Sequence, residues 1–183
     1  LGDGLGRALN QGGTTLLGGD VAVTVVNVPL DDTVVGGLER IGRVSRIAEL
    51  RSSAVIGKTR TAVELKGVDR AYPLYGRVRL ADGGEFAQAL EPRDGRPAAV
   101  VEPALLRRAG ASIGDTVKLG GIDFVITGAL EIEPDRLSAG RFMVGPRIVV
   151  RLQTLREAGL MQRGALIDFR YRIRAPDAMS PQA

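Results

Sequence analysis

Three carboxylates follow one another at every second position near residue 133. Glu131, Glu133 and Asp135 occupy positions i, i+2 and i+4, so on a strand they share one face. Carboxylates in such a group can ligate a hard divalent cation, and a carboxylate pair can serve in glycoside hydrolysis. A cation site needs ligands from several segments, whereas this run passes directly into a turn at Pro134. We therefore expect a solvated strand end here.

Other catalytic arrangements lack their usual residues. The chain has no His and no Cys, which excludes thiolate nucleophiles, Ser–His pairs and Cys or His metal sites. Lys58 and Lys66 are the candidate bases, but both fall in a predicted hairpin, at positions expected to be exposed. The glycine-rich pieces match neither the dinucleotide fingerprint nor a Walker lysine motif. We expect no enzyme and no metal, although a catalytic domain that uses only carboxylates and lysine stays open.

Composition indicates a globular chain without a nucleic-acid tail. Its 183 residues carry a net charge of +4, and the arginines are scattered, which favours a solvated surface. In "FRYRIR", residues 169–174, arginines alternate with apolar residues and predict an amphipathic edge strand. No stretch of 18 or more apolar residues occurs. The chain starts Leu1-Gly2-Asp3 without a methionine and looks like an excised segment, so flanking membrane helices are not excluded.

The first half of the chain predicts a helix followed by strands. Leucines at helical spacing favour a helix over 3–17, and the valine-rich run 20–28 favours a strand. Asp31 or Asp32 can cap a helix that Gly42 ends. Residues 43–56 and 61–69 predict two long strands joined by "GKTR", with a bulge at Gly67.

The second half adds a β-rich unit. A short strand over 77–80 precedes a turn-rich stretch at 81–97, where we place a boundary. Next come a strand at 98–101, a helix at 104–109 opened by Pro103, and a hairpin around Gly120-Gly121. A strand at 147–151, a helix at 154–158 and a strand at 165–174 end the chain. This order predicts an α+β fold.

Three sequence blocks carry a resemblance to a known family. "VVEPALLRRAGASIGDTVKLGGIDFVITGALE", residues 100–131, resembles the extracytoplasmic core domain of MacB/FtsX-type ABC transporter permeases. "ELKGVDRAYPLYG", residues 64–76, and "EPDRLSAGRFMVGPRIVV", residues 133–150, are similar to the YbbP-like branch of these permeases. The match covers most of residues 20–174.

The resemblance implies a two-lobe domain. Residues 1–80 and 147–183 would form a discontinuous Porter-like α/β lobe, and 81–146 an inserted β-rich Sabre-like lobe. The stretch 133–150 would then be the return connection between the lobes. Residues proposed as a hinge between the lobes, or as contacts to a partner or to lipid phosphates, are Asp135, Arg136, Gly140, Arg141, Gly145, Pro146 and Arg147.

The family also implies a biological setting. The domain would be non-catalytic and lie on the periplasmic side of the inner membrane, between two membrane helices of a permease. It would use no cofactor itself, because a separate cytoplasmic ATPase subunit would hydrolyse ATP. Expected roles are mechanotransmission and export of lipid-like molecules. Expected partners are the rest of the permease, that ATPase, and a periplasmic lysophospholipase or esterase. The alternative is a free-standing periplasmic adaptor that binds a lipid or peptide.

Overall fold

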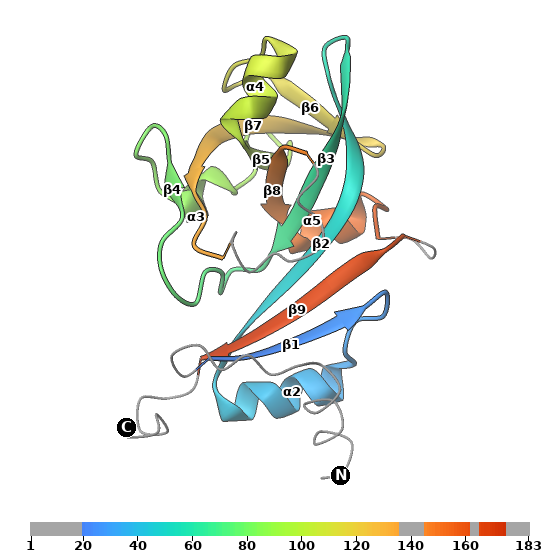
Figure 1. The fold of residues 1–183 in the computed structure, drawn as a ribbon, viewed down its shortest axis with the longest axis vertical. Helices are drawn as coiled ribbons and strands as arrows, with labels where there is room; N and C mark the ends of the chain where they lie inside the picture. The colour runs from blue at the N-terminus through green and yellow to red at the C-terminus, as the bar shows by residue number, and fades with distance from the viewer. Residues whose placement is uncertain (1–19, 136–144, 162–164, 175–183) are drawn as a thin grey trace.

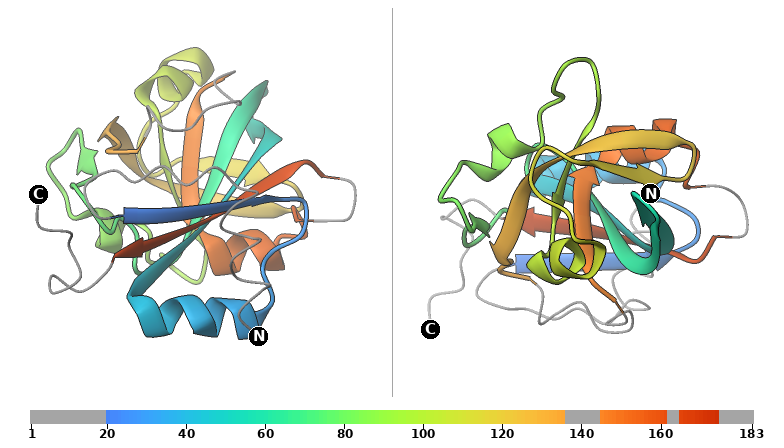
Figure 2. Two further views of the ribbon diagram at one scale, coloured as in Figure 1. Left: turned by 60° about the horizontal axis from the view of Figure 1, so that its bottom comes forward. Right: turned by 90° about the horizontal axis from the view of Figure 1, so that it is seen from above.

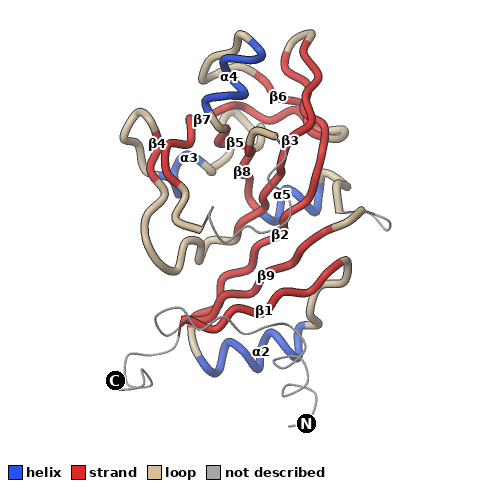
Figure 3. Tube along the Cα trace, viewed as in Figure 1, coloured by secondary structure: helices blue, strands red, loops and turns tan. Residues whose placement is uncertain are grey.

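The computed structural model describes residues 20–135, 145–161 and 165–174, and β-strands dominate this part of the chain (Figure 1, Figure 3). Its strands are β1 (Asp20–Val26), β2 (Arg43–Ile56), β3 (Thr59–Val68), β4 (Arg79–Leu80), β5 (Ala98–Val101), β6 (Thr116–Leu119), β7 (Ile122–Ile132), β8 (Arg147–Arg151) and β9 (Ile167–Arg174). Its helices are α2 (Asp32–Ile41), α3 (Phe86–Ala89), α4 (Pro103–Ala109) and α5 (Leu152–Glu157). None of the helices within these ranges is long and apolar enough to cross a membrane.

The strands form two parts, a closed ring and a small sheet, which share strand β2. Within the described residues, the pairing order is β1-β9-β2-β3-β8-β5-β7-β4, and β6 joins β7 back to β2. The pairs β2–β3, β3–β8, β8–β5, β5–β7, β7–β6 and β6–β2 therefore close a ring. Closure of this kind leaves no free edge in the ring. The right-hand view of Figure 2 shows these strands around a common interior.

The second part is the sheet of β1, β9 and the first half of β2. Helix α2 covers one face of it (Figure 1), and its Val35 and Leu38 are buried. Asp31 caps this helix by accepting a hydrogen bond from the Val34 N–H at 2.9 Å, and Gly42 ends it. Because β2 belongs to both the sheet and the ring, the two parts share one hydrogen-bonded strand.

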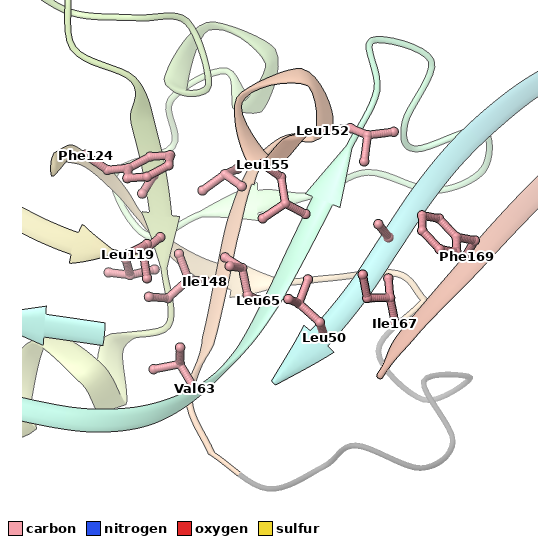
Figure 4. Close-up of a cluster of buried hydrophobic side chains, with 14 of the residues drawn as sticks. Leu50, Val63, Leu65, Leu119, Phe124, Ile148, Leu152, Leu155, Ile167 and Phe169 are labelled. Atoms are coloured by element: carbon pink, nitrogen blue, oxygen red, sulfur yellow. The ribbon is translucent and has the colours of Figure 1, made fainter. Parts of the chain in front are cut away.

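One apolar core joins the ring and the sheet. Figure 4 shows Leu65 of β3, Ile148 of β8 and Phe169 of β9 converging under Leu152 and Leu155 of α5. All five side chains are buried. A smaller apolar cluster, around Tyr72, Phe86 and Val149, lies on the other face of the strands.

Most predicted elements are confirmed, and so is the α+β class. β2, β5 and β8 have the predicted bounds, and Gly120 and Gly121 join β6 to β7 as expected. The predicted helix at 3–17 lies outside the described residues. The lobe boundaries at 80 and 147 stay a prediction. Within the proposed insert, β5 pairs with β7, and β5 also pairs with β8, which lies outside the insert.

Two local predictions were wrong. Gly67 forms no bulge, because it lies in regular register opposite Ala48. A Cβ there would lie 2.7 Å from Leu155 Cδ2, so glycine at this position allows close packing of α5. Strand β9 is not an edge strand, since it lies between β1 and β2.

Candidate functional site

The two blocks that are similar to the YbbP-like branch, residues 64–76 and 133–150, meet in a buried cluster of charged side chains. Lys66 and Glu64 come from β3, Tyr72 from the loop after it, and Glu133 and Asp135 from the residues that directly follow β7. The remaining members are Glu49 of β2, Arg147 of β8, and Arg170 and Arg172 of β9. We call this group of nine residues the ionic cluster.

Lys66 is at the centre of one half of the cluster. Its ammonium group donates to Glu133 Oε1 at 2.5 Å, to Asp135 Oδ2 at 2.8 Å and to the Tyr72 hydroxyl at 3.0 Å. The Tyr72 hydroxyl in turn donates to Asp135 Oδ1 at 2.6 Å. The Lys66 side chain is only 1% exposed. An ammonium has three donors and no acceptor, so a lysine bound in this way holds carboxylates and does not act as a base.

Arg147 is at the centre of the other half. Its Nη1 donates to Glu133 Oε1 at 2.8 Å and to Glu49 Oε1 at 3.1 Å, and its Nη2 donates to Glu64 Oε2 at 3.1 Å. Glu64 is the register partner of Arg147 across the parallel β3–β8 pair. Glu133 contacts both Lys66 and Arg147, so it links the two halves.

Two arginines of β9 connect the cluster to the sheet. Arg170 Nη2 lies 3.0 Å from Glu49 Oε2, and Arg172 Nη2 lies 3.6 Å from Asp135 Oδ2. The alternation of "FRYRIR" explains this placement, because its apolar residues point to the α2 side and are buried. The arginine side of β9 therefore faces the cluster.

A turn at Asp69 positions Tyr72. The Asp69 carboxylate accepts hydrogen bonds from the Arg46 N–H at 2.7 Å, from the Ser45 hydroxyl at 3.0 Å and from the Tyr72 N–H at 3.1 Å. An aspartate that binds nearby backbone groups stabilises a turn. Gly76 has a φ of +72°, and a Cβ there would lie 2.8 Å from Pro134 Cβ. Glycine at position 76 thus allows the loop 69–76 to lie close against Pro134, just after β7.

Burial and pairing shift the pKa values of three members. Burial alone raises the pKa of Asp135, but the charge and hydrogen bonds of Lys66 outweigh it and hold this pKa at about 2. Burial, together with the nearby Asp135 and Glu133, raises the pKa of Tyr72 far above its ordinary value. Burial opposes the charge of Arg147, yet Glu133, Glu49 and Glu64 raise its pKa above the ordinary value. The pairing therefore favours the ionised carboxylate of Asp135 and the charged guanidinium of Arg147.

The residues predicted as hinge or partner contacts are placed as follows. Asp135 and Arg147 lie in the ionic cluster, where Arg147 pairs with Glu49, Glu64 and Glu133. Gly145, at a φ of +124°, and the buried Pro146 lead into β8. A Cβ at Gly145 would lie 2.8 Å from the Ala62 carbonyl oxygen. Arg136, Gly140 and Arg141 lie outside the described residues.

The expectation for the carboxylate run was wrong at two of its three positions. Glu131 is exposed and lies near Arg79, but Glu133 and Asp135 are buried. In the described ranges, no group of three or more carboxylates is placed to hold a metal ion.

Lys66 was also predicted to be exposed, and this prediction was wrong, because its side chain is buried. The sequence held one signal that Lys66 is buried. On the same face of its strand, its neighbours are Glu64, which carries the opposite charge, and Val68, which is apolar.

The comparisons identify the family. The model of the MacB-like periplasmic core domain matches residues 1–183, so the chain belongs to that family. It is 26% identical over 174 residues to YbbP of Escherichia coli (strain K12), a permease described as an uncharacterised ABC transporter permease. The match covers 93% of this chain and 20% of that permease, so the chain spans about a fifth of its length.

Two solved structures share the fold. The extracellular domain of the noncanonical ABC-type transporter YknZ from Gram-positive bacteria has a TM-score of 0.57 and 16% identity, over 82% of this chain and 76% of that one. The periplasmic region of MacB from Actinobacillus actinomycetemcomitans has a TM-score of 0.56 and 15% identity, over 81% of this chain and 66% of that one. The predicted resemblance to MacB-type permeases is thus confirmed.

Proposed function

We propose that this domain is inserted between two membrane helices of an ABC transporter permease and transmits their motion during export or extraction of lipid-like molecules. The supporting observation is the pairing of β1 with β9, in which Asp20 is the register partner of Arg174. The described chain therefore enters and leaves within about 5 Å, one strand separation. Membrane helices that pack together are about 8–10 Å apart, so such ends suit this insertion.

A continuous path leads from these ends into the ring. β9 pairs with β2 from Arg43 to Leu50, and β2 continues into the ring. The ionic cluster adds side-chain links from β9 to β2 through Arg170 and Glu49, and to the end of β7 through Arg172 and Asp135. A displacement of the chain ends would thus pass through hydrogen-bonded strands and buried ion pairs instead of a flexible linker.

The remaining parts of the proposal come from the family. The domain would be non-catalytic and lie on the periplasmic side of the inner membrane. A cytoplasmic ATPase subunit would supply the energy, and a periplasmic lysophospholipase or esterase would be a partner. A free-standing adaptor would instead need a deep apolar pocket. Two pockets in the described part, of about 750 and 840 Å³, are open and lined largely by polar and loop residues, which favours the permease role.

The test measures movement of the domain over the membrane. The complete permease and its ATPase are placed in nanodiscs, with a donor dye on a single cysteine at Lys58 and acceptor dyes on lipid headgroups. Lys58 lies in the exposed β2–β3 turn. We expect ATP to change the energy transfer, and an ATPase-inactive subunit to abolish that change. Energy transfer that stays constant during ATP turnover would contradict the proposal.

A further inference from the structure

We infer that the corner of the domain where the chain enters and leaves binds anionic lipid headgroups at the membrane surface. Four element ends meet at this corner: the start of β1, the end of β9, the start of β2 and the end of α2 (Figure 1). The inference rests on the proposed insertion between membrane helices, because that insertion turns this corner toward the bilayer.

Arginines outnumber carboxylates at the corner. Arg43 of β2 and Arg174 of β9 are direct register partners, and like charges placed opposite each other on adjacent strands repel. Arg40 lies three residues before Arg43 in the last turn of α2. Among the residues whose side chains are described, Arg40 and Arg43 have no ion-pair partner within 4.0 Å; Arg40 donates to a backbone carbonyl. Arg174 packs on the Tyr75 ring, and Asp20 of β1 is its register partner on the other side. Three arginines and one aspartate leave the corner with an excess of positive charge.

This differs from the arginines elsewhere in the same sheet. Arg170, on the same face of β9, binds Glu49 and is largely buried. Arg46, further along β2, binds Glu39 at 2.6 Å. The fold thus pairs Arg46 and Arg170 with glutamates and leaves positive charge in excess where β1 begins and β9 ends. A guanidinium binds phosphate oxygens in a two-pronged geometry, so a phosphate between Arg43 and Arg174 would relieve their repulsion.

Exposed apolar side chains at the corner select a lipid surface over a free phosphate. Tyr75 is 38% exposed, and its ring lies 5.0 Å from the Arg174 guanidinium. Ile41, next to Arg40, is 37% exposed. Tyrosine and arginine together are typical of the interface between headgroups and acyl chains, where the ring is partly buried and the charge reaches phosphates. A soluble phosphate would leave both apolar groups in water.

The test compares two variants of equal charge. One carries Arg40→Gln, Arg43→Gln and Arg174→Gln; the control carries Arg60→Gln, Arg93→Gln and Arg108→Gln, all exposed and away from the corner. Each removes three charges from the same net +4. Binding of the 183-residue chain is measured by flotation with phosphatidylcholine vesicles, with and without phosphatidylglycerol. Circular dichroism verifies that each variant is folded.

We expect the chain to bind only vesicles that contain phosphatidylglycerol. In the corner variant the affinity for these vesicles should fall on the order of a hundredfold, since each arginine near such a surface contributes about fivefold. In the control variant the affinity should fall much less. Absence of binding, or equal losses in both variants, would overturn the inference. Competition by millimolar glycerol phosphate would also overturn it, because the site would then take a soluble phosphate. These assays need neither ATPase nor transport, so they succeed or fail independently of the proposed function.

Fluorescence locates the contact. The chain has no tryptophan, so Tyr75→Trp places a single reporter at the corner, and Ile113→Trp places one between α4 and β6, at the other end of the molecule (Figure 1). Ile113 is 47% exposed. We expect vesicles to shift the emission of the first reporter to shorter wavelength and to leave the second unchanged. The reverse pattern would place the contact at the ring end and overturn the inference.

Discussion

At the scale of the residue, the described cluster balances its own charge. Its cations are Lys66, Arg147, Arg170 and Arg172, and its anions are Glu49, Glu64, Glu133 and Asp135. Buried ion pairs contribute little net stability compared with well-packed apolar groups, but removal of one partner leaves an uncompensated buried charge. The cluster therefore makes the chain sensitive to single substitutions and ties specific strands together.

Lys66→Met tests this sensitivity. The variant keeps the length of the side chain but leaves Glu133 and Asp135 without their shared ammonium, so we expect it to lower the free energy of unfolding by about 3–5 kcal/mol. The control is Lys118→Met, which removes an exposed pair with Asp123 and should change stability by less than ~1 kcal/mol. Urea unfolding measures both. Equal losses would show that the buried pairs have no special role.

The low pKa of Asp135 predicts a pH dependence. The folded-state pKa of Asp135, about 2, lies below the ordinary value of 3.8, so the ionised carboxylate stabilises the fold at pH above 4, and this contribution is lost as the pH falls toward 2. We expect the stability difference between the natural chain and Asp135→Asn to shrink over this range, by on the order of 2 kcal/mol. Urea midpoints at several pH values measure it. A difference that is constant with pH would contradict the pairing with Lys66.

At the scale of the element, α5 reaches its place because β3 carries no side chain at residue 67. The nearest atoms to a Cβ at Gly67 would be Leu155 Cδ2 at 2.7 Å and Leu152 Cα at 3.2 Å. Leu152 and Leu155 are the two side chains by which α5 covers the apolar core (Figure 4). The close approach of helix and strand thus depends on one glycine.

Alanine substitution separates this glycine from ordinary ones. We expect Gly67→Ala to destabilise the chain by about 1–3 kcal/mol, because α5 must shift away from β3. Gly37→Ala, within α2, should instead stabilise it by up to ~1 kcal/mol, since alanine favours a helix and nothing lies within 4 Å of the new Cβ. Thermal unfolding compares the two. A stabilising Gly67→Ala would refute the tight packing described here.

At the scale of the whole molecule, the long strand β2 unites the ring with the sheet that receives both chain ends. Its first half pairs with β9, and its second half pairs with β3 and β6. Because β1 and β9 run antiparallel over their full lengths, force on one end of the described chain is shared directly with the other.

A disulfide tests the position of these ends. The chain has no cysteine, so Asp20→Cys with Arg174→Cys creates one possible bridge. Opposed residues of antiparallel strands have Cα atoms about 4.5–5.5 Å apart, within the range that a disulfide spans. We expect it to form under mild oxidation and to raise the unfolding temperature. The control pair, Thr24→Cys with Arg174→Cys, is out of register by four residues and should keep free thiols. Free thiols in both variants would contradict the pairing.

The sequence by itself determined most of the elements. Valine-rich runs, the Asp31 cap and the Gly120-Gly121 turn act over a few residues, so their strands, helix and hairpin were predicted close to the observed bounds. The three quoted sequence blocks also identified the family. Periodicity placed the arginines of 170–174 on one face of a strand, because side-chain direction along a strand depends only on residue number.

Only the tertiary structure decided what these faces meet. Lys66 and Asp135 are 69 positions apart, and Arg147 and Glu49 are 98 positions apart. Local patterns could not show that the parallel β3–β8 pair and the end of β7 enclose them, so each charge alone looked like a solvated one. Whether a charge is buried depends on partners from distant segments. The sequence therefore determined which residues share a face, and the packing of the strands determined that those faces form one ionic cluster.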